Sequence, residues 1–163
     1  MSIDSRVSTA PPLADHPTEQ PSPGGIDPRG PRVAAWLTTV VLSAVLLTGS
    51  GWLLLAQAAV FATGAFLGLR HSPYGLLYRA FVAPRLGRPT ELEAEQPPRF
   101  AQGVGLVFAV IGSIGYLAGA PVLGAVATGL ALAAAFLNAA FGFCLGCEMY
   151  LIYVRLTRKG VPA

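Results

Sequence analysis

The two cysteines of the chain, Cys144 and Cys147, stand three positions apart in the segment FCLGCEMY. By simple counting, two cysteines placed at random in a chain of this length would have that spacing about 1% of the time. One helical turn would bring both sulfur atoms to the same face, where they could form a disulfide or share a soft metal ion. A nearby helix N-terminus or cation lowers the pKa of a thiol and produces the reactive thiolate. The spacing therefore favours a functional thiol pair.

Three interpretations of this pair stay open. The first is a redox or persulfide-carrying pair, in which one cysteine is the nucleophile and the other resolves the mixed disulfide. The second is a binding site for Zn or Cu(I). A closed zinc site needs two further ligands, and His71 is the only plausible additional ligand because His16 lies in a polar tail. The third is two small apolar residues that only pack. The first interpretation is the leading one, and we predict no resident metal and no cofactor.

Glu148 is the acid closest to the two thiols and is a candidate proton acceptor for them. A carboxylate that marks the end of a membrane segment is the simpler interpretation of the same residue. The sequence contains no Ser/His/Asp arrangement, no phosphate-binding loop and no dinucleotide fingerprint. Any enzymatic activity would therefore depend on the cysteines.

The composition is that of a protein embedded in lipid. Hydrophobic residues make up 53% of the 163 residues, charged residues 12%, and the mean hydropathy is +0.58. A soluble domain typically carries about 25% charged residues, so too little polar material is present to cover a globule of this size. We therefore expect long apolar segments to face a bilayer.

Four apolar runs have roughly the length of a membrane helix, for which about 20 residues is usual. They contain no Lys, Arg, Asp or Glu and cover residues 33–48, 52–69, 100–118 and 122–143. Helices are expected because the bilayer core offers no water to backbone groups. The sequence therefore predicts an all-α, four-helix integral membrane bundle over residues 32–158. The cysteines would lie shallowly, just after the fourth run, with a helix break at Gly142 or Gly146.

The charges predict the orientation of the chain. With four spans, all 11 Lys and Arg residues fall on one side of the membrane, and basic residues near span ends favour the cytoplasm. We therefore predict a multi-pass protein of the bacterial inner membrane with both termini in the cytoplasm. The N-terminal residues 1–31 are expected to form a disordered tail, and residues 159–163 a short C-terminal tail. No clustered basic surface with aromatic platforms indicates a nucleic-acid partner.

The connection between the second and third runs predicts a short amphipathic helix over about residues 73–83. Ser72 and Pro73 are typical of a helix start, and Pro84 would end the pattern. Four apolar or aromatic residues recur at helical spacing, with Arg79 off that face: Tyr74, Leu77, Tyr78 and Phe81. We expect this helix to lie on the inner membrane surface with its aromatic side chains at headgroup level.

Small and amide residues inside the runs indicate close packing. Glycines recur one turn apart at Gly64 and Gly68 and again at Gly115 and Gly119, and we expect them to pack within one bundle rather than to form a dimer interface. Gln57 and Asn138 are amides well inside spans, so each is expected to hydrogen-bond a neighbouring helix. A site role for Asn138 is a secondary interpretation.

Three segments resemble an uncharacterised family of small bacterial integral membrane proteins, common in actinobacteria: IDPRGPRVAAWLTTVVL, SPYGLLYRAFVAPRL and LNAAFGFCLGCEMYL. The resemblance covers roughly residues 26–158, and FCLGCEMY is its most specific part. The family has no established activity, but its association with thioredoxin-like and rhodanese-like sulfurtransferase neighbours implies a sulfur or thiol role. In this sequence, only Cys144 and Cys147 match a family motif whose side chains could take part in chemistry.

The sequence leads to one function hypothesis and one rival. In the first, a cytoplasmic-side CxxC pair exchanges electrons or sulfane sulfur with a soluble thioredoxin-like or rhodanese-like partner. In the rival, the protein is a non-catalytic membrane scaffold or a small transporter subunit whose cysteines only pack. The order in which the two cysteines act is open at this stage.

Overall fold

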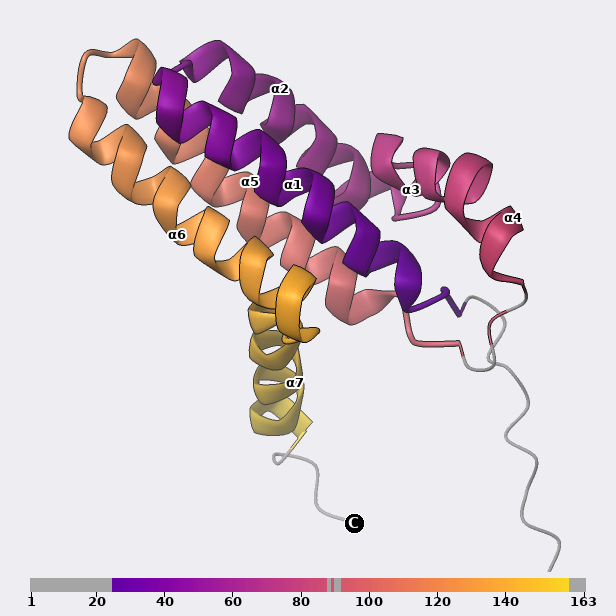
Figure 1. The fold of residues 1–163 in the computed structure, drawn as a ribbon. Coiled ribbons are helices and arrows are strands. Elements are labelled where there is room, and N and C mark those ends of the chain that lie inside the picture. The colour runs from indigo at the N-terminus through magenta and orange to yellow at the C-terminus, as the bar shows by residue number, and fades with distance from the viewer. Residues whose placement is uncertain (1–24, 88, 90–91, 159–163) are drawn as a thin grey trace, which may run out of the picture.

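The computed structural model describes residues 25–87, 89 and 92–158, and these residues are almost entirely helical. Four helical segments form an antiparallel bundle: α1 (Arg29–Thr48), α2 (Gly51–Ala62) with its π-helical continuation η1 (Thr63–Leu67), α5 (Gln96–Leu117) and α6 (Pro121–Phe141). A shorter helix, α7 (Leu145–Arg158), leaves the bundle at an angle to α6 (Figure 1). The prediction of an all-α bundle is confirmed.

Tight turns join the helices at one end of the bundle. Gly49 ends α1 in the left-handed conformation with φ 65°, and the Ser50 Oγ then accepts a hydrogen bond from the Leu53 N–H at 3.3 Å, which caps α2. Gly119, with φ 80°, makes the corresponding turn between α5 and α6. Glycine adopts this conformation without the steric cost that a Cβ would add.

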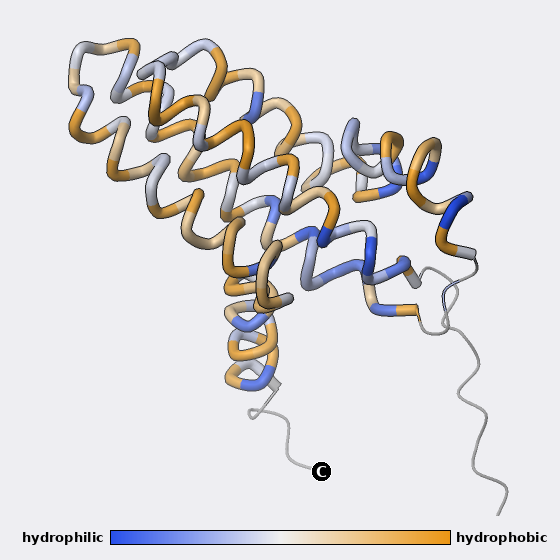
Figure 2. Tube along the Cα trace, in the orientation of Figure 1, coloured by the Kyte–Doolittle hydropathy of each residue, from blue (hydrophilic) through white to orange (hydrophobic). Residues whose placement is uncertain are grey.

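The opposite end of the bundle gathers the polar elements. The start of α1, the start of α5, the end of α6 and helix α7 all lie there, and so do the short helices of the α2–α5 connection (Figure 1). The most hydrophilic residues of the described chain are concentrated at this end (Figure 2). This end, which we call the polar end, carries the candidate site.

The interior of the bundle is small and apolar. It is formed by Leu42, Val45, Leu54, Ala58, Phe61, Ala109 and Ala131. Close glycine contacts join α5 to two neighbouring helices. A Cβ on Gly115 would lie 2.6 Å from the Gly124 nitrogen on α6, and one on Gly112 would lie 2.7 Å from Leu54 Cδ2 on α2. Of the four glycines predicted to pack within the bundle, Gly64 and Gly115 contact neighbouring helices, whereas Gly68 and Gly119 end helical segments with φ 93° and 80°.

The outer surface of the bundle is also apolar. Many large hydrophobic side chains are exposed on it, among them Val40, Leu47, Val107, Ile114, Val122 and Leu130. Three helices, α1, α5 and α6, are long and apolar enough to cross a membrane, and Gly51–Leu67 is a shorter apolar helix. Soluble monomers rarely expose an apolar surface of this extent. The chain therefore has the character of a membrane protein, whereas the four-span count stays a prediction.

The first described residues are folded, so the predicted disordered tail of residues 1–31 is wrong in its last part. Ile26 is buried and forms a β-bridge with Glu93. The Asp27 Oδ1 accepts a hydrogen bond from the Arg29 N–H at 2.9 Å, at the start of α1. These contacts order residues 25–31 because they satisfy backbone groups that a polar tail would leave to water. Residues 1–24 and 159–163 lie outside the described part of the chain.

The predicted surface helix is present but longer and differently oriented. It consists of α3 (Pro73–Leu77), η2 (Tyr78–Val82) and α4 (Ala83–Leu86), and the Ser72 Oγ caps it by accepting a hydrogen bond from the Gly75 N–H at 3.0 Å. It continues past Pro84 because this proline lies at the beginning of α4, where a missing N–H is tolerated.

Two tyrosines of this surface helix point into the protein instead of toward the headgroups. The Tyr74 hydroxyl donates a hydrogen bond to Gln57 Oε1 at 2.6 Å, so Gln57 does contact a neighbouring helix as expected. The Tyr78 hydroxyl donates to Asp27 Oδ2 at 2.5 Å, and its side chain is 5% exposed. Burial, and then the Asp27 hydrogen bond and charge, raise the pKa of Tyr78 to about 12. The two tyrosines fasten the surface helix to the bundle, whereas Phe81 stays exposed.

Candidate thiol site

The site begins where α6 ends. Gly142 takes the left-handed conformation with φ 71°. Its N–H donates a hydrogen bond to the Asn138 carbonyl at 3.0 Å, and the Phe143 N–H donates to the Leu137 carbonyl at 3.3 Å. The bond from the left-handed Gly142 to Asn138 is the αL arrangement that terminates helices. The predicted helix break at Gly142 is therefore confirmed, and it releases the chain so that α7 can take a new direction.

Arg32 on α1 holds the end of α6 from the side. Its Nε and Nη2 atoms lie 3.4 Å and 3.5 Å from the carbonyl oxygens of Ala139 and Ala140, to which they donate hydrogen bonds. A cation at a helix C-terminus satisfies carbonyls that lack partners in the helix and complements the helix dipole. Arg32 thus fixes the position from which the cysteine segment departs.

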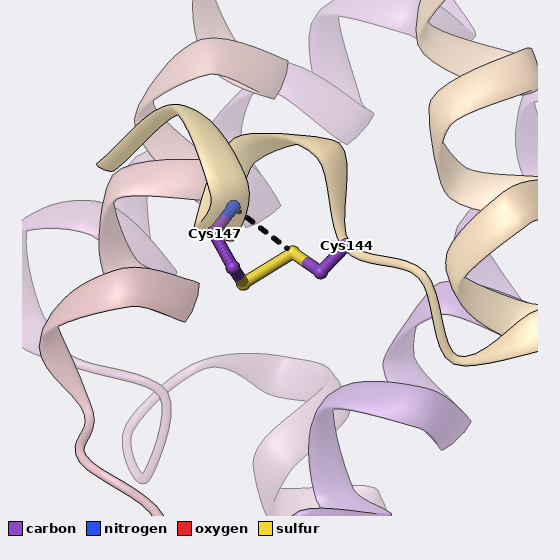
Figure 3. The surroundings of a disulfide bond; sticks show 2 residues. All are labelled: Cys144 and Cys147. Atoms are coloured by element: carbon purple, nitrogen blue, oxygen red, sulfur yellow. Dashed lines mark hydrogen bonds between the residues drawn. A yellow bond between two sulfur atoms is a disulfide. The ribbon is translucent and has the colours of Figure 1, made fainter. Parts of the chain in front are cut away.

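Cys144 occupies the residue position directly before α7 and caps that helix. Its carbonyl accepts a hydrogen bond from the Glu148 N–H at 3.0 Å, and its Sγ accepts one from the Cys147 N–H at 3.3 Å (Figure 3). This is the geometry of an N-cap side chain, with a sulfur atom in place of the usual hydroxyl or carboxylate oxygen. The sulfur of Cys144 therefore lies against the positive end of the α7 dipole.

The two cysteines are joined by a disulfide bond (Figure 3). Their Cα atoms are 5.2 Å apart, a separation common for disulfides. Both side chains are half-buried. The predicted proximity of the two sulfurs is present, although Cys144 caps the helix and Cys147 lies in its first turn.

Gly146, between the cysteines, does not break the helix. A Cβ on it would lie 2.6 Å from both Cα and Cβ of Ala101 on α5, closer than atoms approach. This glycine lets the first turn of α7 press against α5, and the rings of Phe100 and Tyr150 pack beside it with centroids 5.8 Å apart. Of the two positions predicted for the helix break, only Gly142 is one, because the missing side chain of Gly146 serves helix–helix contact.

Glu148 and His71, the other candidate residues, do not join the cysteines in a larger cluster. Glu148 is exposed in the first turn of α7, where its charge complements the helix dipole. The His71 Nδ1 lies 3.0 Å from the Leu67 carbonyl, at the end of η1. Across residues 25–87 and 92–158, no group of three or more His, Cys, Asp and Glu side chains is placed to hold a metal ion. The proton-acceptor role of Glu148 stays a prediction.

A cavity of about 320 Å³ lies beside Cys144 and opens to the outer surface of the bundle, where the exposed Leu130 lines it. Helices α1, α5 and α6 form its walls, and residues 144–146 and Met149 close one side. Its lining is mostly Ala, Gly, Val, Leu and Phe, with three polar side chains, Thr38, Gln102 and Asn138. The signals in the sequence that relate to this cavity are the amides of Gln102, at the edge of an apolar run, and Asn138, inside one.

The comparison with protein families confirms the resemblance. The model of the family described as Domain of unknown function (DUF4395) matches residues 26–155. The chain belongs to this family. The DUF4395 region contains the bundle, Arg32, both cysteines and the cavity, so the whole candidate site is part of the family domain. Neither a curated protein nor a solved structure matches the chain.

Proposed function

We propose that the protein is a membrane-bound thiol–disulfide relay, in which the Cys144–Cys147 pair takes electrons from a soluble protein of the thioredoxin-like type. The observation that supports this proposal most is the Cys144 sulfur at the N-terminus of α7, where it accepts the Cys147 N–H. A cysteine that served only as a packing residue would not need its sulfur at a helix N-terminus. Helix N-termini are where the thiolates of reactive CxxC pairs are stabilised.

The position of Cys144 assigns different tasks to the two sulfurs. A sulfur whose thiolate is stabilised is the better leaving group in thiol–disulfide exchange. A thiolate of the partner therefore attacks Cys147 Sγ, the intramolecular S–S bond breaks, and Cys144 leaves as a thiolate.

A second exchange completes the transfer. The second thiolate of the partner attacks the partner's own sulfur in the mixed disulfide and releases Cys147 as a thiolate. The relay has then gained two electrons as a dithiol, and the partner carries a disulfide. The two-cysteine arrangement thus needs no metal or further group for this half-reaction.

The location of the pair suits a soluble partner. The cysteines lie at the polar end of the bundle, beyond the end of α6, and the described arginines concentrate at the same end. The distribution of basic residues leads us to expect that this end faces the cytoplasm. A soluble dithiol protein would reach the pair there while α1, α2, α5 and α6 stay in the bilayer.

The test is the reduction of the oxidised full chain, held in lipid nanodiscs, by a reduced soluble thioredoxin. We expect one disulfide to be lost for each thioredoxin oxidised, as counted by maleimide mass shifts. A thioredoxin that lacks its resolving cysteine should form a mixed disulfide that peptide mapping locates on Cys147. Persistence of the disulfide, under conditions where dithiothreitol reduces the unfolded chain, would refute the proposal.

A further inference from the structure

We propose that the cavity beside Cys144 binds the ring of a membrane quinone, which accepts the two electrons of the reduced pair. This inference rests on the proposed function, because a relay that takes electrons from a soluble protein must pass them on.

The cavity has the size and the character of a site for an uncharged, lipid-soluble molecule. Its volume of about 320 Å³ is within the range of small-molecule sites. No Asp, Glu, Lys, Arg or His lines it, and the rings of Phe61 and Phe108 form part of its wall. Because the walls are apolar helices of the bundle, a ligand dissolved in the bilayer is the kind of molecule that this cavity suits.

Three polar side chains in the cavity lack partners within the described chain. Thr38 is 4% exposed, and Gln102 and Asn138 are half-buried. None of these hydroxyl and amide groups makes a side-chain hydrogen bond to another described group, whereas the buried hydroxyls of Ser113 and Thr128 do. Among the described residues, Gln57 Nε2 is the one fully enclosed side-chain polar atom without a partner. The hydroxyl and amide groups of Thr38, Gln102 and Asn138 are therefore accessible and can donate hydrogen bonds to a ligand that supplies neutral acceptors. The two carbonyl oxygens of a quinone ring are such acceptors.

One cysteine of the pair is in contact with the cavity. Cys144 lines it and Cys147 does not. Cys144 is also the residue that becomes the stabilised thiolate when the pair is reduced, so the reducing sulfur is already beside the cavity. A partner at Cys147 and a quinone at Cys144 can thus act from different sides of one disulfide.

The reaction balances without a further reagent. The thiols of Cys144 and Cys147 lose two electrons and two protons, and an S–S bond forms between them. The quinone takes up both electrons and two protons, one at each ring oxygen, and becomes a quinol. The net reaction is dithiol plus quinone to disulfide plus quinol, which returns the pair to the oxidised state seen in the structure.

The test uses the full chain in nanodiscs, reduced and freed of reductant under anaerobic conditions. The probe is a quinone with a fully substituted ring and a short alkyl tail, which thiols cannot add to. We expect one quinol, followed by absorbance, for each disulfide formed, and a rate that saturates with quinone concentration. A wild-type protein that forms no quinol, or a rate that rises linearly with quinone concentration, would overturn the proposal.

Two variants and a matched control identify the place of the reaction. Ala135→Leu fills the cavity and Asn138→Leu removes an amide from it, so each should lower kcat/KM for the quinone about tenfold. Ala133→Leu adds the same bulk on the same helix at an exposed position and should change nothing. Equal rates in all four proteins would overturn the proposal, because a quinone that reacts elsewhere, or a lipid chain that fills the cavity, predicts that result.

The two proposals can fail separately. If thioredoxin reduces the disulfide but the quinone does not reoxidise it, the quinone site is refuted and the relay stands. If thioredoxin does not reduce the disulfide, the relay itself is refuted, whatever the quinone does.

Discussion

Cys144 and Cys147 have the same side chain but different surroundings. The Cys144 sulfur accepts a hydrogen bond at the start of α7, whereas Cys147 lies within the first turn. The sequence predicted a pair and left the order of the two residues open. That order depends on where α7 begins, and the helix begins after Cys144 because Gly142 ends α6 two residues earlier.

We predict that the two thiols differ in reactivity when each is present alone. In Cys147→Ser, the remaining Cys144 should react with iodoacetamide at pH 7 about tenfold faster than Cys147 does in Cys144→Ser, because the helix terminus stabilises its thiolate. Mass spectrometry of time-quenched samples measures both rates. The rates should converge in denaturant, and equal rates in the folded proteins would contradict the account.

Tyr78 gives a prediction for alkaline pH. Its pKa is raised to about 12 by burial and by Asp27, against about 10 for an unfolded tyrosine. Because the folded pKa is the higher one, the stabilising contribution of the neutral phenol is complete below pH 10 and is lost as the pH rises toward 12. The experiment uses a Tyr74→Phe background, because burial also raises the pKa of Tyr74. Absorbance at about 295 nm should show a late tyrosine transition that Tyr78→Phe removes and that the exposed-site control Tyr153→Phe keeps. A late transition that survives in Tyr78→Phe would contradict this assignment.

At the scale of elements, the sequence predicted the segments well and their contacts poorly. Apolar runs bounded by Gly49, Gly119 and Gly142 gave the ends of α1, α5 and α6 to within a few residues. The close approach of α7 to α5 at Gly146 was missed, because it joins residues far apart in the chain. The inward tyrosines were missed for the same reason, since their partners Gln57 and Asp27 come from other elements.

The contact between α7 and α5 gives a prediction with a matched control. Gly146→Ala places a methyl group against Ala101, so it should lower the thermal stability of the protein and separate α7 from α5. Gly103→Ala adds the same methyl group on α5 in open space and should leave stability unchanged or slightly raised. Thermal unfolding in nanodiscs measures both. Equal melting temperatures for the two variants would show that the contact is not needed.

For the whole molecule, we predict four membrane crossings. Three helices have the length and composition to cross a membrane, and Gly51–Leu67 is shorter. At 1.5 Å per residue it spans about 25 Å, slightly less than a bilayer core of about 30 Å. Its N-terminal turn and the α5–α6 turn lie at the end of the bundle opposite the polar end (Figure 1). The shape therefore favours four crossings.

Topology reporters distinguish three crossings from four. With four, fusions at residue 24, at residue 89 and at the C-terminus should all report the cytoplasm, and an insertion at Gly119 should report the other side. With three, the N-terminal and C-terminal fusions would report opposite sides. A reporter placed at Gly103, in the middle of α5, is the control, because it shows the signal of a reporter that disrupts a membrane helix.

The cavity also belongs to the scale of the whole molecule, since residues from five elements line it. Thr38 is unremarkable in the sequence and becomes notable only when α1 and α6 lie side by side. Asn138 stands out as an amide inside an apolar run, but its side chain lines the cavity and does not make the predicted hydrogen bond to a neighbouring helix. A single-sequence pattern specifies which face of a helix is apolar, but it does not specify where packing leaves a space. The CxxC motif could be found from the sequence, whereas the cavity beside it could not.

The most direct test of the account is a redox titration of the Cys144–Cys147 pair in native membranes. Membranes are equilibrated with glutathione buffers across a range of potentials, free thiols are labelled with a maleimide mass tag, and the oxidised fraction is measured. We predict a single reversible two-electron transition with a midpoint above about −300 mV, less reducing than structural disulfides. Cysteines that stay fully reduced, or a disulfide that stays intact, at every potential in the range would contradict the account.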